Sequence, residues 1–541
     1  MQNQFLQDEQ TVLIIGSGPT GLIMAILLTD FGIPVRIIDR LDKPLSTSRA
    51  FTLHARTLEL LEQLGLSRKY LEKGIKTFSM DYHFPGNTNV PKLDFKDLDS
   101  VYPFTLTIDQ SITEKVLRDH LISLGVPIEW NTELKDLNST KKSSAITLQH
   151  LESGKIEELE TIWVIGCDGH SSSVRKNLNL QLDGSDYGGT MRMIDVSLSG
   201  FNKSNQAIHY FIAKDHMLLI NKLPGDNYRV LISDKTEGVP PEKSKEAFQK
   251  VLDKHFSGQV VIGDPVWSTN FRISKRKVNT YKVNTVFLAG DAAHINSPAG
   301  GQGMNVAIQD AFNLGWKLAL VIKGIAKESF LDSYAEERSP IAEQMLEGTN
   351  YIHSIIMAHG QGMEERIKRM EGGKWNKKAV NQIAGISYTY RNSDTVGLLA
   401  AGDRAPDCFY TEKKRVYDLF SHLQYTLLVF ADKNPTNKEL NSLDENIQEI
   451  LGYSKLPITP YIIVSHENEN TSKTKVITDN GNFCKTYLVS ENQSEKSYFM
   501  IRPDCHIAYC GNSIGGIKEY IKSNFNLLKE INNNSSNLMN V

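Results

Sequence analysis

Apolar runs that stop abruptly at glycine and aspartate set the pattern of this chain, and the clearest of them covers residues 286–289. Such a run is typical of a strand buried on both faces. Gly290-Asp291 ends the run, a glycine-rich loop follows, and from Asn305 onward apolar residues recur at helical spacing. The face opposite to these apolar residues carries Gln309, Asp310, Asn313 and Lys317. We therefore predict a strand, a loop and a helix in that order.

The loop between this strand and this helix suits a flat, partly anionic ligand. Glycines leave room for close approach, and the N-terminus of a helix favours negative charge. The alternative is an ordinary connection with many glycines, but such a loop weakens packing unless something occupies it. We therefore expect a ligand near Asp291.

The N-terminal segment repeats this arrangement with a more specific motif. A β-branched run at residues 11–15 leads into Gly-Ser-Gly-Pro-Thr-Gly at residues 16–21, and a helical pattern follows. Between a strand and a helix, G-x-G-x-x-G lets a pyrophosphate approach the helix N-terminus. A second strand at residues 35–38 ends in Asp39, where a ribose hydroxyl is bound in such units. We predict a dinucleotide-binding unit; the alternative is a glycine-bearing βαβ unit without a ligand.

Three further segments carry polar residues next to predicted elements. A third apolar run, from residue 161, ends at Asp168-Gly169, and serines then offer N-caps for a short helix that carries Arg175. Arg49 and Gln110 each stand at the entry of a predicted helix. Arg49 can pair with a phosphate through its planar guanidinium, although a surface arginine is an even alternative. Taken alone, Asp-Gly is only a turn signal.

Residues 184–276 have the composition of an antiparallel sheet. Strand-like runs cover residues 191–198, 207–213, 217–223 and 228–232. We expect this sheet to be inserted into the nucleotide domain and to form the wall of a pocket. The candidates to line it are His209, Tyr210, His216, Tyr228, Arg229 and Phe271. Alternation places about half of any strand on the inner face, so a plain sheet role is the main alternative for each.

The C-terminal part indicates a small α/β domain. Residues 331–370 read as charged helix, and the Gly/Pro-containing stretch 402–407 marks a boundary. The elements expected beyond it are strands at 425–430, 461–464 and 486–489 and helices at 442–451 and 517–531. Cys505 and Cys510 are too far apart for a redox C-x-x-C motif, so we interpret them as ordinary thiols.

Composition narrows the class of protein. The chain has 541 residues, a net charge of -3, 40% apolar residues and 23% charged residues, as in a soluble globular protein with no basic footprint for nucleic acid. Its cysteines, 5 in number, do not form a disulfide framework. Asp8 and Glu9 stand where a signal peptide would be basic, and the apolar run after them is too short to span a bilayer. We expect a cytoplasmic protein.

The glycine motif at residues 16–21, the stretch from Cys167 to Arg175 and the stretch from Gly290 to Asn305 together resemble the class A FAD-dependent aromatic hydroxylases, which share the p-hydroxybenzoate hydroxylase fold. The third stretch is closest to the branch of phenol hydroxylases, polyketide hydroxylases and rifampicin monooxygenase. That branch carries a C-terminal thioredoxin-like domain without redox cysteines, and residues 402–407 and 502–508 resemble its markers. Cys505 departs from them, because the branch usually has glycine there.

This resemblance implies an α/β fold with a Rossmann-type FAD-binding domain and an inserted, mainly antiparallel substrate domain. The expected boundaries are 1–183 and 277–400 for the two parts of the FAD-binding domain, the latter with connecting helices, 184–276 for the substrate domain and 401–541 for the thioredoxin-like domain.

The resemblance also implies which residues bind FAD. They are Gly16, Gly18, Pro19, Thr20, Gly21, Asp39, Arg40, Arg49, Gln110, Leu134, Asp168, Asp291, Met304 and Asn305. In that assignment the glycines and Thr20 hold the pyrophosphate, Asp39 and Arg40 flank the adenosine ribose, and the main chain at Leu134 touches adenine.

The remaining assignments concern the flavin end. Arg49 and Gln110 contact the phosphates and ribityl chain, Asp291 binds the ribityl or pyrophosphate region, and the N–H groups of Met304 and Asn305 face the flavin pyrimidine edge. Pro298 lies beside the isoalloxazine. Asp168 and Arg175 help to order the dinucleotide and NAD(P)H regions. No metal is expected.

The function implied is an NAD(P)H-consuming monooxygenase that uses O₂ to hydroxylate an aromatic or phenolic substrate through a flavin C4a-hydroperoxide. His209, His216 and Tyr228 are candidates for the substrate-activating base, with no choice among them. An antibiotic-inactivating, rifampicin-type monooxygenase is the main alternative. A flavin halogenase and a non-catalytic flavin-bound carrier are further alternatives. The sequence contains no Trp-x-Trp-x-Ile-Pro stretch that would support a halogenase. A homodimer is left open.

Overall fold

The structure is a computed structural model, and it divides into two compact units. It describes residues 4–5, 11–45, 50–87, 90–234, 244–296, 300–356, 363–370, 373–391, 399–432, 435–465, 472–489 and 496–528. The first unit comprises Met1–Ile26, Pro34–Ala311 and Arg338–Ser387, and the second comprises Leu27–Ile33, Phe312–Glu337 and Tyr388–Val541. No described helix combines the length and the apolar character that crossing a bilayer requires.

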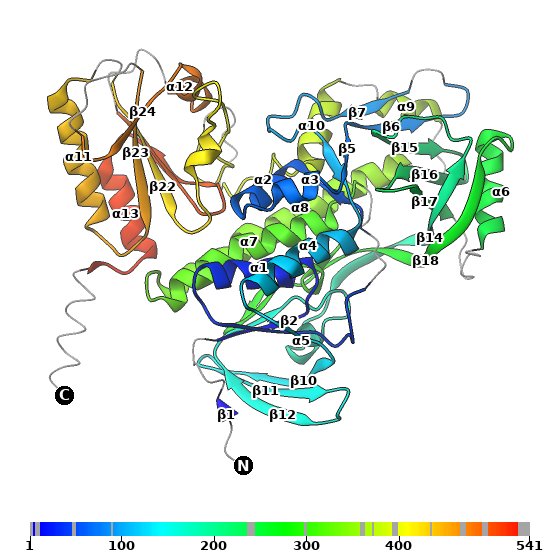
Figure 1. Cartoon of the computed structure of the whole chain (residues 1–541), viewed down its shortest axis with the longest axis horizontal. Helices are drawn as coiled ribbons and strands as arrows, with labels where there is room; N and C mark the ends of the chain where they lie inside the picture. The colour runs from blue at the N-terminus through cyan, green and yellow to red at the C-terminus, as the bar shows by residue number, and fades with distance from the viewer. Residues whose placement is uncertain are drawn as a thin grey trace. The chain divides into compact units, whose positions relative to one another are not determined.

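A six-stranded, mainly parallel sheet organises one part of the first unit (Figure 1). Its order is β19-β20-β13-β2-β3-β9, and only the β19–β20 pair is antiparallel. The bounds are β2 (Val12–Ile15), β3 (Val35–Ile38), β9 (Ile128–Glu129), β13 (Val164–Gly166), β19 (Lys282–Val283) and β20 (Val286–Leu288). Because parallel strands end at the same edge, the turns after β2, β13 and β20 meet there. The fold class predicted from the three motifs is confirmed.

Helices follow these strands where the sequence predicts them. They are α1 (Pro19–Asp30), α4 (Gln110–Ser123), α5 (Ser173–Asn177) and α7 (Gly303–Ile322). The polar side of α7 is buried as thoroughly as its apolar side, since Asp310 and Lys317 are both fully covered. Charges on this helix therefore need partners inside the protein.

A second, eight-stranded sheet forms the other half of the first unit. Its order is β21-β18-β14-β17-β16-β15-β6-β7, and every neighbouring pair is antiparallel except β15 with β6. The bounds are β6 (Ser79–His83), β7 (Lys92–Asp94), β14 (Asp183–Ser199), β15 (Ala207–Ile212), β16 (His216–Lys222), β17 (Asn227–Asp234), β18 (Val261–Lys277) and β21 (His294–Ile295). The predicted antiparallel sheet is present, and β6 and β7 join it from an earlier part of the chain.

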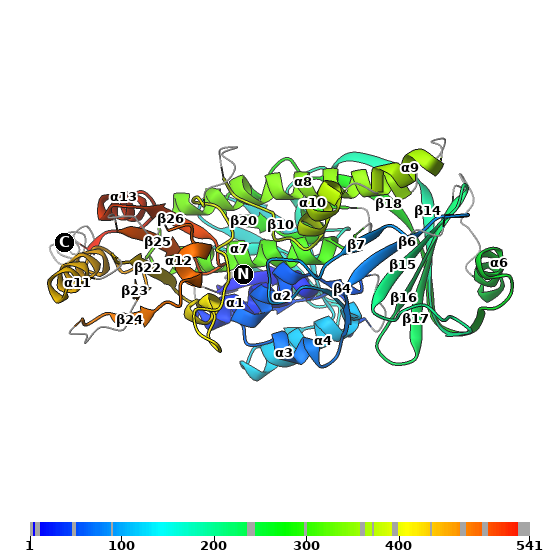
Figure 2. The same cartoon turned by 90° about the horizontal axis from the view of Figure 1, so that it is seen from above.

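The two faces of this sheet have different surroundings. One face packs against α6 (Lys245–Phe256), as Figure 2 shows, through a core that includes Phe211, Leu218 and Phe248. Strand alternation turns the intervening side chains to the other face. That face contributes to the cavity described below.

Smaller elements complete the first unit. A four-stranded sheet and a three-stranded sheet have the orders β1-β12-β11-β10 and β4-β8-β5. Their strands are β1 (Gln4–Phe5), β4 (Thr52–Leu53), β5 (Ile75–Thr77), β8 (Thr105–Thr107), β10 (Thr132–Ser139), β11 (Ser144–His150) and β12 (Ile156–Thr161). The helices are α2 (Ala55–Gln63), α3 (Ser67–Leu71), α9 (Met363–Met370) and α10 (Gly373–Ile383), and α8 (Asp332–Ile356) begins in the second unit and continues into the first.

The second unit contains a five-stranded sheet of order β24-β23-β22-β25-β26. The parallel β22-α11-β23 half is followed by an antiparallel β25-β26 pair and α13, in agreement with the predicted small α/β domain. The bounds are β22 (Tyr425–Phe430), α11 (Asn437–Leu451), β23 (Ile458–Val464), β24 (Lys475–Thr478), α12 (Asn482–Thr486), β25 (Ser497–Ile501), β26 (Ile507–Gly511) and α13 (Ile514–Asn524).

Two local features of this unit bear on the sequence. The prediction of a strand at 486–489 is wrong: helix α12 ends at Thr486, and the chain then turns, with Leu488 at a φ of 55°. The Asp479 carboxylate accepts the N–H groups of Phe483 and Cys484 at 2.9 Å each and so stabilises the start of this helix. Cys505 has a φ of 56°, the left-handed conformation that glycine adopts freely. The branch of hydroxylases that the sequence resembles usually has glycine at this position, and the left-handed backbone conformation explains that preference.

Candidate functional site

Two adjoining cavities open where the turns after β2, β13 and β20 meet. The larger cavity has a volume of about 1190 Å³, and the smaller cavity has a volume of about 290 Å³. Both are lined by Leu45, Gly18, Gln110, Cys167, Gly169 and Ser171. Residues from all three sequence motifs therefore surround one continuous concave region.

The structure distributes the predicted cofactor residues between the two cavities. The smaller cavity is lined by Gly16, Asp39, Arg40, Leu134 and Asp168, in addition to the shared Gly18 and Gln110. The larger cavity is lined by Pro19, Thr20, Asp291 and Met304. Gly21 and Asn305 line neither and support the walls from behind. Arg49 and Pro298 lie outside the residues that the structure describes.

The glycines of the first motif have distinct tasks. A Cβ at Gly16, whose φ is 101°, would stand 2.5 Å from the carbonyl oxygen of Cys167, and one at Gly21 would stand 2.0 Å from the carbonyl oxygen of Gly16. These two glycines permit backbone packing. At Gly18 and Gly169, in contrast, an added Cβ would meet no atom within 4 Å. Both line the cavities, so the backbone there is open to the close approach of a ligand.

Aspartates hold the turns in shape. Asp39 accepts hydrogen bonds from the Ser17 N–H and hydroxyl, both at 2.8 Å, and from the Leu41 N–H at 3.0 Å. Asp168 accepts from the Ser173 N–H at 2.6 Å and the Val174 N–H at 3.2 Å, and so caps α5. Both carboxylates thus order the loops on which the ligand-binding backbone lies.

The Gly-Asp loop is tied to α7 by a buried charge. Asp310 accepts the Gly290 N–H at 3.1 Å and the His294 Nε2–H at 2.7 Å, and Arg338 Nε donates to its other oxygen at 2.7 Å. Burial alone would raise the pKa of Asp310, but Arg338 and His294 outweigh burial and leave this pKa below its ordinary value. The loop that presents Asp291 therefore rests on an ionised carboxylate.

The loop before α7 is anchored by neutral groups. Asn305 Oδ1 accepts the His54 N–H at 2.8 Å, while its Nδ2 donates to the carbonyls of Thr52 and Gly301 at 3.0 and 2.8 Å. His54 Nε2 lies 2.8 Å from the Gly300 carbonyl oxygen, which requires the protonated tautomer at that nitrogen. Burial lowers the pKa of His54 to about 4, so the ring is uncharged at neutral pH. The first turn of α7 consequently faces the larger cavity in a defined position.

The opposite wall of the larger cavity is an apolar sheet face. It comprises Met191, Ile208, Tyr210, Met217, Leu219, Leu231, Trp267 and Phe271. Burial raises the pKa of Tyr210, whose ring stacks on Tyr82 at 4.8 Å, so this phenol stays protonated. An apolar wall opposite a helix N-terminus can exclude water from a flat ligand held between them.

The three candidates for a substrate base do not line the cavity. His209 faces the other side of β15 and contacts His83 and the Ser204 carbonyl. His216 contacts Asp215 and His255, and the Tyr228 hydroxyl donates to Asn205 at 3.1 Å. Tyr210 and Phe271, from the same predicted set, do line it.

Sequence reasoning missed several lining residues. Trp130 and Glu114 line the smaller cavity, and Gln110 Nε2 donates to Glu114 Oε1 at 2.8 Å. Burial raises the pKa of Glu114. The spacing of four between Gln110 and Glu114 was a usable signal, because it puts both side chains on one face of α4. For Trp130 and Trp267 the sequence gives no such signal beyond the aromatic side chain itself.

Comparisons with known proteins match this geometry. A family model described as an FAD binding domain matches residues 9–349. Pentachlorophenol 4-monooxygenase of Sphingobium chlorophenolicum is 40% identical over 451 residues, covering 82% of this chain and 84% of that protein. Rifampicin monooxygenase of Streptomyces venezuelae is 32% identical, covering 70% of this chain and 79% of that protein.

Solved structures extend the likeness over nearly the whole chain. The anhydrotetracycline hydroxylase of Streptomyces rimosus aligns with 95% of this chain and 98% of its own, with a TM-score of 0.71 at 24% identity. A flavin-dependent monooxygenase in complex with FAD and substrate aligns with 95% and 97%, with a TM-score of 0.75 at 18% identity. At these identities the likeness concerns the fold.

Proposed function

The chain belongs to the FAD-binding family of aromatic monooxygenases, and we propose that its FAD spans both cavities and that its substrate is a phenol already ionised near neutral pH. FAD supplies the oxygen-transfer chemistry when bound. The residues of the chain bind and orient FAD, exclude water and shape the space for the substrate. The observation that carries the proposal is the pairing of an open glycine backbone with an apolar stretch of sheet wall, beside which the one described carboxylate of the sheet lining, Asp186, is held by Ser274 and Arg276.

The fit to FAD rests on the open backbone at the cavities. The smaller cavity takes the adenosine half, with Asp39, Arg40 and Leu134 around it. The pyrophosphate lies against Gly18 and the first turn of α1, where backbone N–H groups and the helix dipole favour its charge. The flavin ring would then be held in the larger cavity, which Asp291 and Met304 at the start of α7 line.

Pro298 and Arg49 keep the roles that the family resemblance implies, beside the flavin ring and at the phosphates, as part of this proposal. Asn305 contributes its N–H, since its side chain is occupied in holding the loop. The domain boundaries at residues 183, 276 and 400 remain proposals of the same kind. A cytoplasmic location and a homodimer remain predictions from the sequence.

The sheet wall indicates the type of substrate. Its apolar residues offer aromatic and thioether contacts, and the phenol among them, Tyr210, is held protonated by burial. Asp186 also lines the cavity, but hydrogen bonds from Ser274 and Arg276 lower its pKa and make it a weak base. A phenol with an ordinary pKa near 10 needs a base before its ring becomes electron-rich enough to react. Electron-withdrawing ring substituents lower the pKa of a phenol and remove this need. The relative that acts on pentachlorophenol is consistent with such a substrate.

NAD(P)H is proposed as the reductant that enters the same region transiently, because the sequence contains no second G-x-G-x-x-G motif. O₂ is the other co-substrate.

The test is substrate-stimulated consumption of NADPH or NADH by the FAD-loaded protein at pH 7.5. We expect 2,4,6-trichlorophenol to stimulate consumption at least about tenfold more than unsubstituted phenol, with an oxygenated product in the mass spectrum. Equal stimulation by phenol would contradict the ionised-substrate proposal. Absence of stimulation by any aromatic compound would favour a flavin-bound carrier, and a halogenated product would favour a halogenase.

A larger antibiotic substrate is the second candidate. Rifampicin monooxygenases and tetracycline hydroxylases are among the relatives at 30–32% identity. Including rifampicin in the same panel separates the two, since stimulation by rifampicin with none by chlorophenols would favour the antibiotic-modifying activity.

A further inference from the structure

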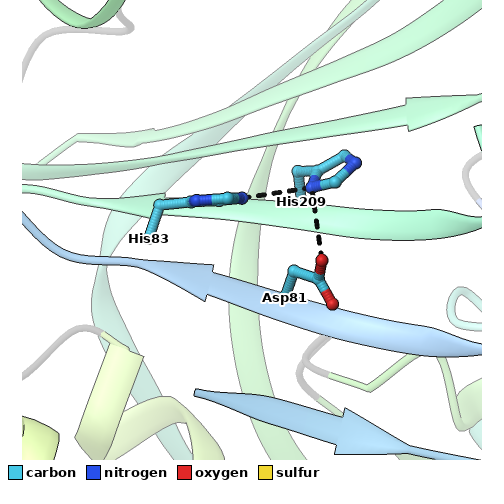
Figure 3. Close-up of side chains that lie close together, drawn as sticks. All are labelled: Asp81, His83 and His209. Carbon is cyan, nitrogen blue, oxygen red and sulfur yellow. Dashed lines mark hydrogen bonds and ion pairs between the residues drawn. The ribbon is translucent and has the colours of Figure 1, made fainter. Parts of the chain in front are cut away.

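Three metal-ligand side chains meet on the outer sheet face, away from the flavin cavity. Asp81 and His83 come from β6, and His209 comes from its parallel neighbour β15 (Figure 3). One ligand atom from each lies within 4.8 Å of the others: the gap is 3.1 Å between His83 Nε2 and His209 Nδ1, and 4.0 Å between His209 Nδ1 and Asp81 Oδ2. In the β6–β15 register, Asp81 stands directly opposite His209.

The surroundings orient each of these side chains. His209 Nε2 lies 2.9 Å from the Ser204 carbonyl oxygen, which places the proton on Nε2 and leaves a lone pair on Nδ1. The Ser79 hydroxyl donates to Asp81 Oδ1 at 2.6 Å and leaves Oδ2 toward the histidines. The His83 ring stacks on Phe211 with centroids 4.5 Å apart and planes at 12°. Hydrogen-bonded histidines and carboxylates of this kind are usual around protein metal sites.

We propose that Asp81, His83 and His209 bind one divalent transition-metal ion, with Zn²⁺ as the best match. Two imidazoles and one carboxylate suit zinc, which accepts three protein ligands and a water molecule. Mg²⁺ and Ca²⁺ prefer sites made wholly of oxygen. His83 is half-buried, so its side offers a route from solvent.

The charge balance supports this proposal and limits its affinity. Metal binding requires an unprotonated imidazole nitrogen, and the Ser204 carbonyl, by keeping the His209 proton on Nε2, leaves Nδ1 free to ligate. Lys92 competes for the carboxylate, with Nζ 3.7 Å from Asp81 Oδ2, but its side chain is 53% exposed and can turn into water. Lys203 adds a second opposing charge.

A metal ion here would fasten two segments that lie far apart in the sequence. It would lock β6 to β15 at the position where Tyr82 and Tyr210 stack on the cavity side of the same strands. The proposed role is therefore structural support of the substrate wall, and the ion takes no part in the reaction.

A second histidine pair, between β16 of the same sheet and α6, provides a matched control. His216 Nε2 and His255 Nε2 are 2.8 Å apart, but Asp215 contacts the far nitrogen of His216 at 2.8 Å instead of the gap between the rings. The same residue types are present there without convergence of three ligand atoms. A variant at His255 thus removes a histidine of similar environment and leaves the proposed site intact.

The experiment uses the FAD-loaded full chain, treated with chelator, dialysed and titrated with ZnCl₂, with bound zinc counted by elemental mass spectrometry. We expect one zinc per chain, at least about tenfold weaker binding in H209A and H83Q, unchanged binding in H255A and tighter binding in K92M. Zinc should also raise the Tm of the wild-type protein and of H255A, but not that of H83Q. A tenfold excess of Mg²⁺ should not displace zinc.

Equal zinc binding by wild type, H209A and H83Q, or loss of binding in H255A alone, would overturn the proposal. Substoichiometric zinc that Mg²⁺ displaces would do the same. H83Q keeps the test decisive if the more buried H209A fails to fold. Because zinc binding is counted directly, its failure leaves the hydroxylase proposal standing, and failure of substrate oxidation leaves the metal proposal standing.

Discussion

Arg175 donates a hydrogen bond from Nη1 to the carbonyl oxygen of Ala292 over 3.0 Å, and from Nη2 to that of His170 over 2.8 Å. This guanidinium joins the turn after β13 to the Gly-Asp loop after β20. Its burial, which lowers its pKa, shows that the contact is made inside the protein. Two sequence motifs more than a hundred residues apart are thereby held as one wall of the larger cavity.

Removing this link should loosen FAD. R175A leaves two carbonyls without their donor, at a cost of about 1–3 kcal/mol, and we expect an increase of about tenfold in the Kd for FAD. Flavin fluorescence titration measures it. R68A, on an arginine whose side chain is 89% exposed, is the control and should leave the Kd unchanged. An R175A protein that binds FAD like the wild type would show that the link is dispensable.

Two glycines of the first motif should fail in different ways when changed to alanine. G16A forces a Cβ to within 2.5 Å of a backbone carbonyl at a positive φ, so the FAD-free protein should lose several kcal/mol of stability. G18A meets open space, so the FAD-free protein should lose less than about 1 kcal/mol while FAD affinity falls. Urea unfolding and FAD titration of both variants separate the effects. Normal FAD binding by G18A would place the cofactor elsewhere.

Stability should fall between pH 6.5 and pH 4, in part because of His54. Burial lowers the pKa of His54 to about 4, so in this window the unfolded chain binds a proton that the folded chain does not. The contribution is at most about 3 kcal/mol and is complete above pH 6.5. His83 and His255, whose pKa values are also lowered to about 4, titrate in the same window.

H54Q keeps a donor for the Gly300 carbonyl but cannot titrate. We expect it to remove about 2–3 kcal/mol of the pH dependence, measured as free energy of unfolding in urea at pH 7.5, 6, 5 and 4.5. An unchanged slope in H54Q would mean that His54 titrates normally in the folded protein.

The second unit contains a buried charge group whose members should differ in importance. Glu337 accepts from Arg502 Nη1 at 2.7 Å, from Arg502 Nη2 at 2.9 Å and from Lys317 Nζ at 2.8 Å. Burial would raise the pKa of Glu337, but the two cations hold it at about 2. E337A leaves the buried Lys317 without its carboxylate and Arg502 with Asp504 alone, and should cost about 3–5 kcal/mol, whereas K317M keeps the Arg502–Glu337 pair and should cost much less.

Thermal and urea unfolding followed by tryptophan fluorescence report this difference, since Trp316 lies 5.2 Å from the Arg502 guanidinium. If K317M proves as damaging as E337A, the lysine and not the bidentate arginine dominates the group.

Local signals account for what the sequence predicts correctly. A strand, its glycine turn and the following helix are encoded within about twenty residues, so the turns at Gly18, Asp168 and Asp291 were predictable. Parallel pairing then brings their ends to one edge. The strands of the eight-stranded sheet were equally predictable, but alternation alone does not determine which face of a strand lines the cavity. His209 and Tyr210 are adjacent in sequence, yet Tyr210 lines the cavity and His209 lies on the other face of the sheet.

Long-range partners account for what could not be predicted. The sequence places Asp310 on the polar side of a helix, but its partners His294 and Arg338 come from other segments, and only packing makes that side internal. A turn after α12, with Leu488 in the left-handed conformation, stands where a strand was predicted, and the β-like run of residues 486–489 conceals this turn. The metal-ligand cluster was invisible for the same reason: His209 is more than a hundred residues from Asp81.

One face of the eight-stranded sheet packs under α6 and the other lines the larger cavity, and this separation has an evolutionary consequence. Side chains such as Met217 and Leu219 look into the cavity from strands whose alternate residues, such as Leu218, belong to the core under α6. Mutation can therefore reshape the ligand-facing set one residue at a time while the shared scaffold endures. A fold built in this way can change the shape of its cavity while the packing that stabilises it stays the same.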